Sequence, residues 1–481
     1  MTTAECPPTV EGAHAKPRCF LLKQLSLALF GLLLFSYSVV HQANLGGTPN
    51  SRFDLLHALF VRGTFRIDDY HENTPDKAIF ESHFYSDKAP GGVALALPGF
   101  AVSALLMKTL GIDLDSADGW RYSSWVTIIL GVGLPAAAGG VAMFLWLLHW
   151  LPPPPAMLTT LALFLGAAPF PYATMFFTHA QVAGMIAFAL LCLTPSQRIL
   201  PWRESTKLLL AGFSCGWALA SELQAGIVVV ALGVVVLLRG FRPALLFSFA
   251  ALPPLLLIPA YSWVCFGTPF TLGYSHQAVF PEMQKGLFGI VWPDALTAVN
   301  LLFGPTRGLF FWSPFLLLAV YGYRELWHRS RVWFWVCLIV PILQITVISG
   351  YTWDWMAGWV ILPRYLTSAL PLLALPVGFA CKRWPKIGGT LAVVSIGIIT
   401  VATFVDASPS DGVYNPLTEY VLPHMMSDHY TDNIASLFYV FGHWGAWPLM
   451  MLIWAGAFLL WQAAGRIESI GGNTNGEPSA D

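Results

Sequence analysis

Long runs of apolar residues with almost no charge recur from one end of the 481-residue chain to the other. About 20 apolar residues are needed for a helix to cross the hydrocarbon of a bilayer. Because every backbone polar group in lipid must be satisfied within the protein, such runs can fold only as helices. Hydrophobic residues make up 56% of the chain and charged residues 11%, against about 25% charged in a soluble domain. The sequence therefore predicts an all-α polytopic bundle of transmembrane helices.

The runs predict about 12 to 13 spans, beginning with a retained span at 20–40 that is too long for a signal peptide. The net charge of −1 gives no reason to expect a nucleic-acid partner. The other candidates are 91–111, 123–149, 156–176, 179–195, 206–221, 223–238, 243–265, 309–323, 332–350, 364–381, 387–405 and 446–464.

Basic residues gather in the short connectors near positions 200, 240, 327 and 384. Because cytoplasmic loops carry an excess of Lys and Arg, these connectors are expected inside the cell. Three longer segments, 41–90, 266–308 and 406–445, then lie outside. We expect one multi-span membrane domain over 1–465 and a disordered cytoplasmic tail over 466–481. A bacterial inner (plasma) membrane, with the active site on its periplasmic or extracellular face, fits this arrangement.

One candidate span conflicts with this arrangement, because thirteen crossings that start inside would end outside, whereas Arg466 indicates an inside end. Residues 91–111 open with Gly91-Gly92 and contain Pro98. Irregular backbone is tolerated in a membrane where it lines a protein cavity. We therefore expect 91–111 to be a re-entrant or juxtamembrane segment.

The first outer loop, 41–90, holds the most informative charges. Most of its carboxylates fit a solvated loop, but Asp54 and the pair Asp87-Lys88 lie near predicted membrane boundaries. Charge is costly there unless it is paired or faces a water-filled cavity. Asp54 and Asp87 are thus candidate catalytic carboxylates, and Lys88 is a candidate substrate contact.

Other polar residues stand beside apolar runs at the expected outer surface. Arg307 offers a planar fork for phosphate oxygens, although a snorkelling role remains open. Tryptophans around Asp354 and Arg364 fit either an interfacial belt or a sugar-binding surface, and Glu222 fits either a solvated turn or a cavity wall. The further candidate substrate contacts are Tyr274, His276 and Trp353.

The segment Tyr85-Ser-Asp-Lys-Ala-Pro-Gly91 resembles the motif at which the chain re-enters the membrane in the GT-C superfamily of polyprenyl-phosphate-dependent glycosyltransferases. The similarity is greatest to the protein mannosyltransferase and aminoarabinose transferase branch, and it covers most of the chain as a pattern of spans. Asp54 corresponds to the family's early acidic residue, although the usual Asp-Glu pair is absent and Ala89 replaces a proline. His179 lies where relatives often carry an Asp.

The resemblance implies transfer of a sugar from a polyprenyl-phosphate carrier to a lipid, glycan or protein acceptor. Asp54 is the expected base, and Lys88, Arg307 and Arg364 are the expected phosphate contacts. A divalent cation held by Asp54, Asp87 and His179 is compatible with this reading but not required by it. A lipid or solute transporter or flippase, and a polysaccharide ligase or polymerase, are the alternatives.

Overall fold

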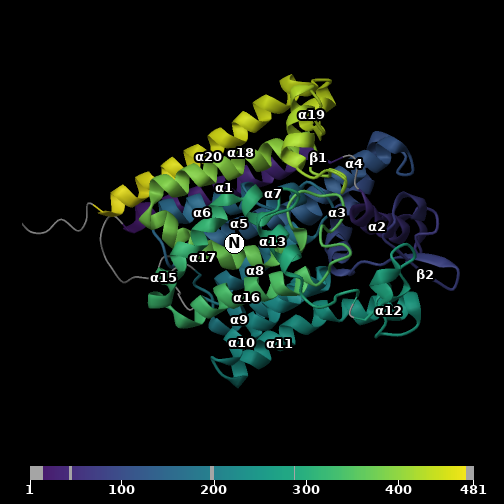
Figure 1. The fold of residues 1–481 in the computed structure, drawn as a ribbon, viewed down its shortest axis with the longest axis horizontal. Helices are drawn as coiled ribbons and strands as arrows, with labels where there is room; N and C mark the ends of the chain where they lie inside the picture. Colours follow the sequence, from purple (N-terminus) through teal and green to yellow (C-terminus); the bar gives the residue numbers. More distant parts are fainter. Residues whose placement is uncertain (1–14, 43–45, 195–199, 287, 473–481) are drawn as a thin grey trace, which may run out of the picture.

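A computed structural model describes residues 15–42, 46–194, 200–286 and 288–472, and these residues are mostly helical (Figure 1). Eight helices are long and apolar enough to cross a membrane, and three shorter apolar helices pack among them. The prediction of an all-α polytopic bundle is confirmed. The protein is an integral multi-pass membrane protein.

Along the described chain we count twelve passes through the bundle, and they alternate in direction. The passes are α1 (Ala15–Ser38); α4 (Ala117–Ile128) continued by η3 (Ile129–Gly133) and α5 (Leu134–Leu147); α6 (Pro153–Leu165) with α7 (Pro169–Ala173); α8 (His179–Cys192); α9 (Glu204–Ser221); α10 (Gly226–Leu237); α11 (Phe241–Leu255) with α12 (Leu257–Phe266); α14 (Leu309–Trp312), η7 (Pro314–Leu318) and α15 (Ala319–Arg329); α16 (Arg331–Ser349); η8 (Arg364–Ala369) with α17 (Leu370–Arg383); α18 (Pro385–Val405); and α20 (Gly442–Gly472).

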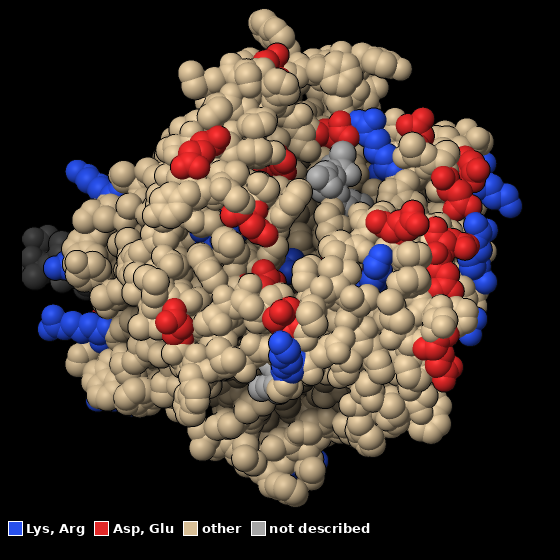
Figure 2. Space-filling view, turned by 45° about the vertical axis from the view of Figure 1, so that its right-hand side comes forward, with Lys and Arg blue, Asp and Glu red and all other residues tan. Residues whose placement is uncertain are grey.

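The two ends of the bundle differ in charge. One end, here called the basic end, holds the connectors 200–207, 238–242, 324–331 and 382–386, which are linked there by contacts such as those of Arg239 with Glu204 and of Arg329 with the Phe379 ring. The opposite end, the loop end, holds residues 46–90, 267–308 and 406–441. Figure 2 turns the loop end forward and shows acidic and basic side chains mixed on its right, with basic ones at the left edge.

The helix α3 (Gly91–Leu110) lies at the loop end and does not reach the basic end. Its glycine Gly99 packs against Leu130 and Gly131, so α3 runs beside the first half of the long α4–α5 helix. The connector after α3 returns to the first loop, where Asp115 accepts a hydrogen bond from Arg62 at 3.2 Å. Both ends of α3 therefore contact the same loop, although by length and composition α3 is one of the eight helices that could cross a membrane. The juxtamembrane placement stays a prediction.

Two predicted spans are interrupted rather than continuous. The run 156–176 ends as a helix at Leu165 and resumes at Pro169, and the run 309–323 is divided at Ser313–Pro314. Proline lacks an N–H and clashes with the preceding turn, which accounts for both breaks. At the C-terminus α20 continues to Gly472, so residues 466–472, predicted to be disordered, are helical. Residues 473–481 lie outside the described residues.

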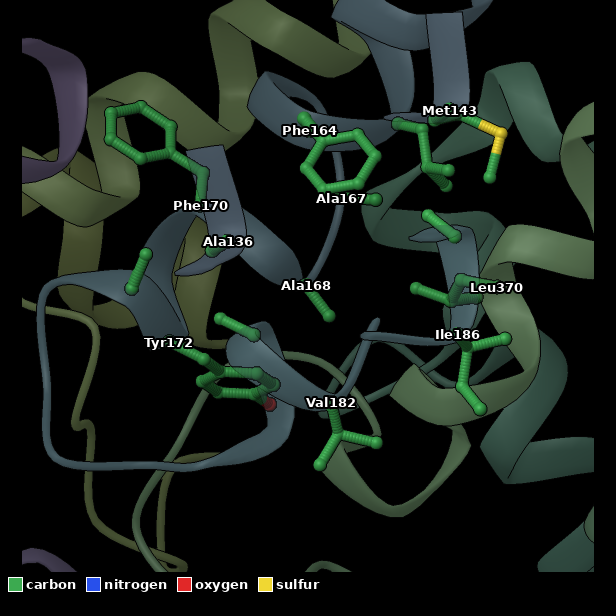
Figure 3. Packing of buried hydrophobic residues seen from close by; sticks show 14 of the residues in the cluster. Ala136, Met143, Phe164, Ala167, Ala168, Phe170, Tyr172, Val182, Ile186 and Leu370 are labelled. Carbon is green, nitrogen blue, oxygen red and sulfur yellow. The ribbon is translucent and has the colours of Figure 1, made fainter. Parts of the chain in front are cut away.

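The core of the bundle is formed where α5, α6, α7, α8 and α17 meet (Figure 3). Small residues permit the closest helix crossings: Gly139 faces Gly184 between α5 and α8, and Gly322 faces the Pro376 backbone between α15 and α17. Association of helices in lipid depends on such close packing because lipid tails are as apolar as leucine. Tyr172 in this core donates to the carbonyls of Ile361 and Leu362, which ties a loop-end segment to the bundle.

The loop end is built from short elements over the bundle. In the first loop these are α2 (Gly47–His57), η1 (Ala58–Arg62), η2 (His71–Asn73) and the hairpin of β2 (Lys77–Phe80) with β3 (His83–Ser86). The strand β1 (Val40–His41) pairs antiparallel with β4 (Asp432–Asn433). The remaining elements are η4 (Leu223–Ala225), η5 (Gly273–His276), η6 (Pro281–Gln284), α13 (Ala295–Phe303), η9 (Leu417–Val421), α19 (Leu422–Met426) and η10 (Ile434–Phe438).

The placement of α3 predicts the sidedness of the connector that follows it. On a background without native cysteines, Glu72→Cys and Asp113→Cys should both react with an impermeant thiol reagent in intact cells, because both exposed positions lie at the loop end. Arg329→Cys, at the basic end, should react only after the membrane is permeabilised. Labelling of Glu72→Cys but not of Asp113→Cys would mean that α3 crosses the membrane.

Candidate active site

A cavity of about 230 Å³ lies at the loop end, where α9, α10, α16 and η8 meet the first outer loop. A cavity of this size suits a compact polar group. Its polar wall is formed by Thr48, Arg52, Lys88, His179, Glu222, Gln224, Tyr274, Gln344, Tyr351, Arg364 and Tyr365. Its apolar wall is formed by Leu223, Ile227, Met283, Phe288, Ile290, Val347 and Ile348.

The segment Pro90-Gly91-Gly92 brings the first loop against the bundle. A Cβ atom on Gly91 would collide with the backbone of Ala220, and one on Gly92 would collide with the Thr178 side chain. Only glycine permits this approach of backbone to backbone. The contact sets Lys88 beside the end of α9 and the start of α8.

Lys88 is held by two carboxylates from the first loop. Its ammonium lies 3.2 Å from Asp76 and 3.3 Å from Asp87, and it stands over the Tyr274 ring at 5.4 Å from the centroid. Burial alone would lower the pKa of Lys88, but the two carboxylates raise it above its ordinary value. Burial likewise opposes ionisation of Asp76, yet Lys88 brings the pKa of Asp76 below its ordinary value. Lys88 and Asp76 are therefore both charged, whereas burial raises the pKa of Asp87 above its ordinary value.

A second ion pair also lines the cavity. Arg52 donates to the Glu222 Oε1 atom at 2.6 Å and to the Phe176 carbonyl at 3.3 Å. Thr178 also donates to Glu222 Oε1, and the His179 Nε2 atom lies 3.7 Å from the same oxygen. Although burial opposes ionisation, these neighbours lower the pKa of Glu222 to about 2. Glu222 thus presents a fixed negative charge to His179.

Arg364 has no such partner. Among the described residues no carboxylate lies within 4.0 Å of its guanidinium, and its Nε atom has no hydrogen-bond partner. Its hydrogen bonds are long, to the hydroxyls of Thr48 and Tyr365 at 3.4 Å each, and its charge stands 4.8 Å from the Phe177 ring centroid. Burying an unpaired charge is costly. The Arg364 guanidinium is therefore available to an anion that enters the cavity.

The structure brings five of the residues predicted from the sequence to this cavity and places the others around it. The lining residues are Lys88, His179, Glu222, Tyr274 and Arg364. Asp87 stands behind Lys88, where it also accepts from Gln277 at 3.2 Å. Asp54 is fully buried outside the lining, and its Oδ1 atom accepts from Asn73 at 3.0 Å while Oδ2 has no partner among the described residues.

The remaining predicted residues lie in neighbouring loops. Arg307 is buried and paired with Asp411 at 3.3 Å, and it donates to the carbonyls of Thr306 and Gly358. Asp354 accepts from the Gly358 amide at 3.2 Å. Trp353 packs against Tyr351 with centroids 4.8 Å apart, and His276 stacks on Phe266 at 5.0 Å. None of these four belongs to the cavity lining.

Sequence reasoning missed Arg52, Asp76, Tyr351 and Tyr365 as members of the site. Arg52 stands two residues before Asp54, within the same short helix, and Asp76 stands in the segment Thr74-Pro-Asp-Lys. In the sequence alone both resemble ordinary charged residues of a loop, because their partners, Glu222 and Lys88, are not adjacent to them in the chain. For Tyr351 and Tyr365 the one local signal was a charged residue close by in the sequence, Asp354 for the first and Arg364 for the second.

The metal-binding candidates do not converge. In the described part of the chain, no three His, Cys, Asp or Glu side chains are grouped so that they could hold a metal ion. His179 faces Glu222, Asp87 faces Lys88 and Asp54 faces Asn73.

Comparisons with known proteins add a distant likeness to a solved structure. No family model and no curated protein matches the chain. A solved structure of the archaeal oligosaccharyltransferase AglB from Archaeoglobus fulgidus, in complex with an inhibitory peptide and a dolichol-phosphate, aligns with 93% of this chain at a TM-score of 0.41 and 13% identity. The chain spans 56% of the length of that protein.

Asp354 predicts a pH-dependent stability. Burial raises its pKa to about 6. A carboxyl group whose pKa is raised by folding contributes stability below its unfolded pKa, and this contribution is lost as pH rises through 6. Asp354→Asn cannot ionise, so relative to wild type it should gain roughly 1–2 kcal/mol of unfolding free energy between pH 5 and pH 7.5. Unfolding in a mild detergent at the two pH values measures this gain, and an equal difference at both would contradict the raised pKa.

Proposed function

We propose that the protein is a membrane glycosyltransferase that moves a sugar from a polyprenyl-phosphate donor to a lipid, glycan or protein acceptor at the loop end, taken as the non-cytoplasmic face. The observation that carries this proposal is Arg364, a buried guanidinium without a carboxylate partner in the wall of a half-apolar cavity. The proposal accords with the motif resemblance to the GT-C superfamily.

The cavity has the charges that a lipid phosphate requires. The fork of Arg364 suits two phosphate oxygens, and Lys88 offers a second positive charge in the same cavity. Positive groups fixed in advance stabilise the charge that grows on the departing phosphate. Because Asp76 and Asp87 already balance Lys88, Arg364 is the primary phosphate contact.

The apolar wall supplies a place for the prenyl chain. Ile227 comes from α10, and Val347 and Ile348 come from α16. The outer surfaces of these two helices carry exposed Val230, Val234, Ile339 and Leu343, as expected of helices in lipid. A cavity of this volume holds only a headgroup, so the chain leaves it along α10 and α16 toward the membrane.

The remaining groups account for the sugar and the acceptor. Tyr274, Tyr351 and Tyr365 present rings and hydroxyls to the cavity. We assign removal of the acceptor proton to His179, oriented by Glu222 in the manner of a carboxylate–histidine pair. The acceptor oxygen then bonds to the anomeric carbon, the carbon–oxygen bond to the phosphate breaks, and the lipid phosphate leaves with the electron pair.

The structure makes Arg364 and Arg307 a matched pair for testing the phosphate role, since both are buried but only Arg364 lines the cavity. Arg364→Lys should lower transfer by about 10²-fold or more, because a point charge cannot reproduce bidentate binding to phosphate. Arg307→Lys should change transfer little at equal protein level. The measurement is transfer of radiolabelled sugar from polyprenyl-phosphate donors by purified protein in lipid.

Equal losses in the two variants would point to a general structural role for buried arginine. Wild-type transfer by Arg364→Lys would remove the phosphate assignment. If no donor supports transfer by the wild-type protein, flux through proteoliposomes tests the transporter alternative.

The base is tested by comparing His179 with Asp54, the residue favoured by the sequence. His179→Gln should lose a factor of about 10² to 10⁴ in transfer, the usual contribution of a general base. Asp54→Asn, whose amide keeps the carboxylate shape outside the cavity lining, should retain most of it. The reverse order of effects would assign the base to Asp54. Asp87→Asn should weaken donor binding through Lys88 and raise KM more than it lowers kcat.

A further inference from the structure

A second hollow, of about 630 Å³, lies at the basic end between α15 and α17. The two helices are in closest contact at Gly322 and Pro376, and the hollow opens beside this contact. Its floor includes the buried side chain of Phe379, and its rim includes Tyr321 and Trp384. The hollow is at the opposite end of the bundle from the candidate active site.

The rim of this hollow has an excess of unpaired positive charge. Arg324, Lys382 and Arg383 line it, and none of them has a carboxylate within 4.0 Å among the described residues. The single carboxylate in the lining, Glu325, is engaged by Arg329 at 2.7 Å. The hollow therefore favours an anionic occupant.

Aromatic and apolar groups place the hollow at a membrane surface. The rings of Tyr321 and Trp384 meet edge to face with centroids 5.0 Å apart across the rim. Trp and Tyr gather at the level of lipid headgroups. Beside the rim, Val320 on α15 and Ile387 and Val393 on α18 are exposed, as expected of a surface that faces acyl chains.

A role in topology alone does not explain this arrangement. Positive charge in a connector orients a membrane protein without needing any hollow, as the connectors at 203–207 and 239–242 illustrate. At α15 and α17 the cations instead surround a concave space with an aromatic rim and an apolar flank. Basic pockets between helices on the cytoplasmic side are typical of sites for anionic lipid headgroups.

We propose that the hollow between α15 and α17 binds the headgroup of an anionic phospholipid from the leaflet at the basic end. The phosphodiester contacts Arg324, Lys382 and Arg383, and the acyl chains lie along the exposed faces of α15 and α18. A bound lipid of this kind contacts α15, α17 and α18, and adds to the direct packing of α15 against α17 at Gly322 and Pro376.

The test is lipid retention, measured by native mass spectrometry of protein released from nanodiscs that mix phosphatidylglycerol with phosphatidylcholine of the same chain length. The wild-type protein should retain phosphatidylglycerol in preference to phosphatidylcholine. The triple variant Arg324→Gln, Lys382→Gln, Arg383→Gln should bind it on the order of 100-fold more weakly, from about 1 kcal/mol for each cation.

The matched control is the triple variant Arg203→Gln, Arg242→Gln, Lys386→Gln, which removes the same charge from exposed positions of neighbouring connectors outside the hollow. It should retain phosphatidylglycerol as the wild type does, and inorganic phosphate should not displace the lipid. Equal loss in both triple variants, retention in both, or displacement by phosphate alone would overturn the proposal. Size-exclusion profiles establish that each variant is folded.

Discussion

The structure of the loop end depends on one close contact, between Gly91 and Gly92 at the start of α3 and the ends of α9 and α8. Because these glycines have no Cβ, the backbone of the first loop reaches Ala220 and Thr178 directly. Lys88, three residues earlier, is thereby fixed next to Glu222 and His179, which come from the bundle. A larger residue at either position would move the first loop outward and open the cavity to water. The site thus depends on this close packing as well as on its ion pairs.

The charges of the cavity follow from this assembly. Each buried cation except one has a carboxylate: Arg52 has Glu222, and Lys88 has Asp76 and Asp87. Since breaking a buried ion pair leaves an uncompensated charge, these pairs hold the walls of the cavity in place. Arg364 is the exception, and its long hydrogen bonds to two hydroxyls leave its fork available. In the proposed function, the phosphate of the donor supplies a partner for Arg364, so that donor binding also compensates the buried charge.

Much of the fold could be predicted from the sequence, because the length of an apolar run and the sorting of Lys and Arg depend on the bilayer rather than on tertiary contacts. The parity of the crossings also predicts that 91–111 does not cross the membrane. The site was harder. In the sequence Asp76 resembles a solvated loop carboxylate, whereas in the structure it is buried and contacts Lys88 and Thr48. Arg52 belongs to the site because it pairs with Glu222, which lies 170 residues away in the chain. Asp54 was a candidate because it lies near a predicted membrane boundary, but its partner in the structure is Asn73.

The position of α3 explains how one bundle holds polar groups at the edge of lipid. Beginning against the end of α9 and extending away from the basic end, α3 shields Lys88 and Asp87 from one side while its own termini contact the first loop. A helix that crossed fully would have carried its C-terminal end to the opposite face and left Arg62 and Tyr70 without Asp115. The cost of ions in a membrane falls when protein, rather than lipid, surrounds them. With α3 placed in this way, the cavity lies beneath the loops and is bordered by Ile227 of α10 and Val347 of α16.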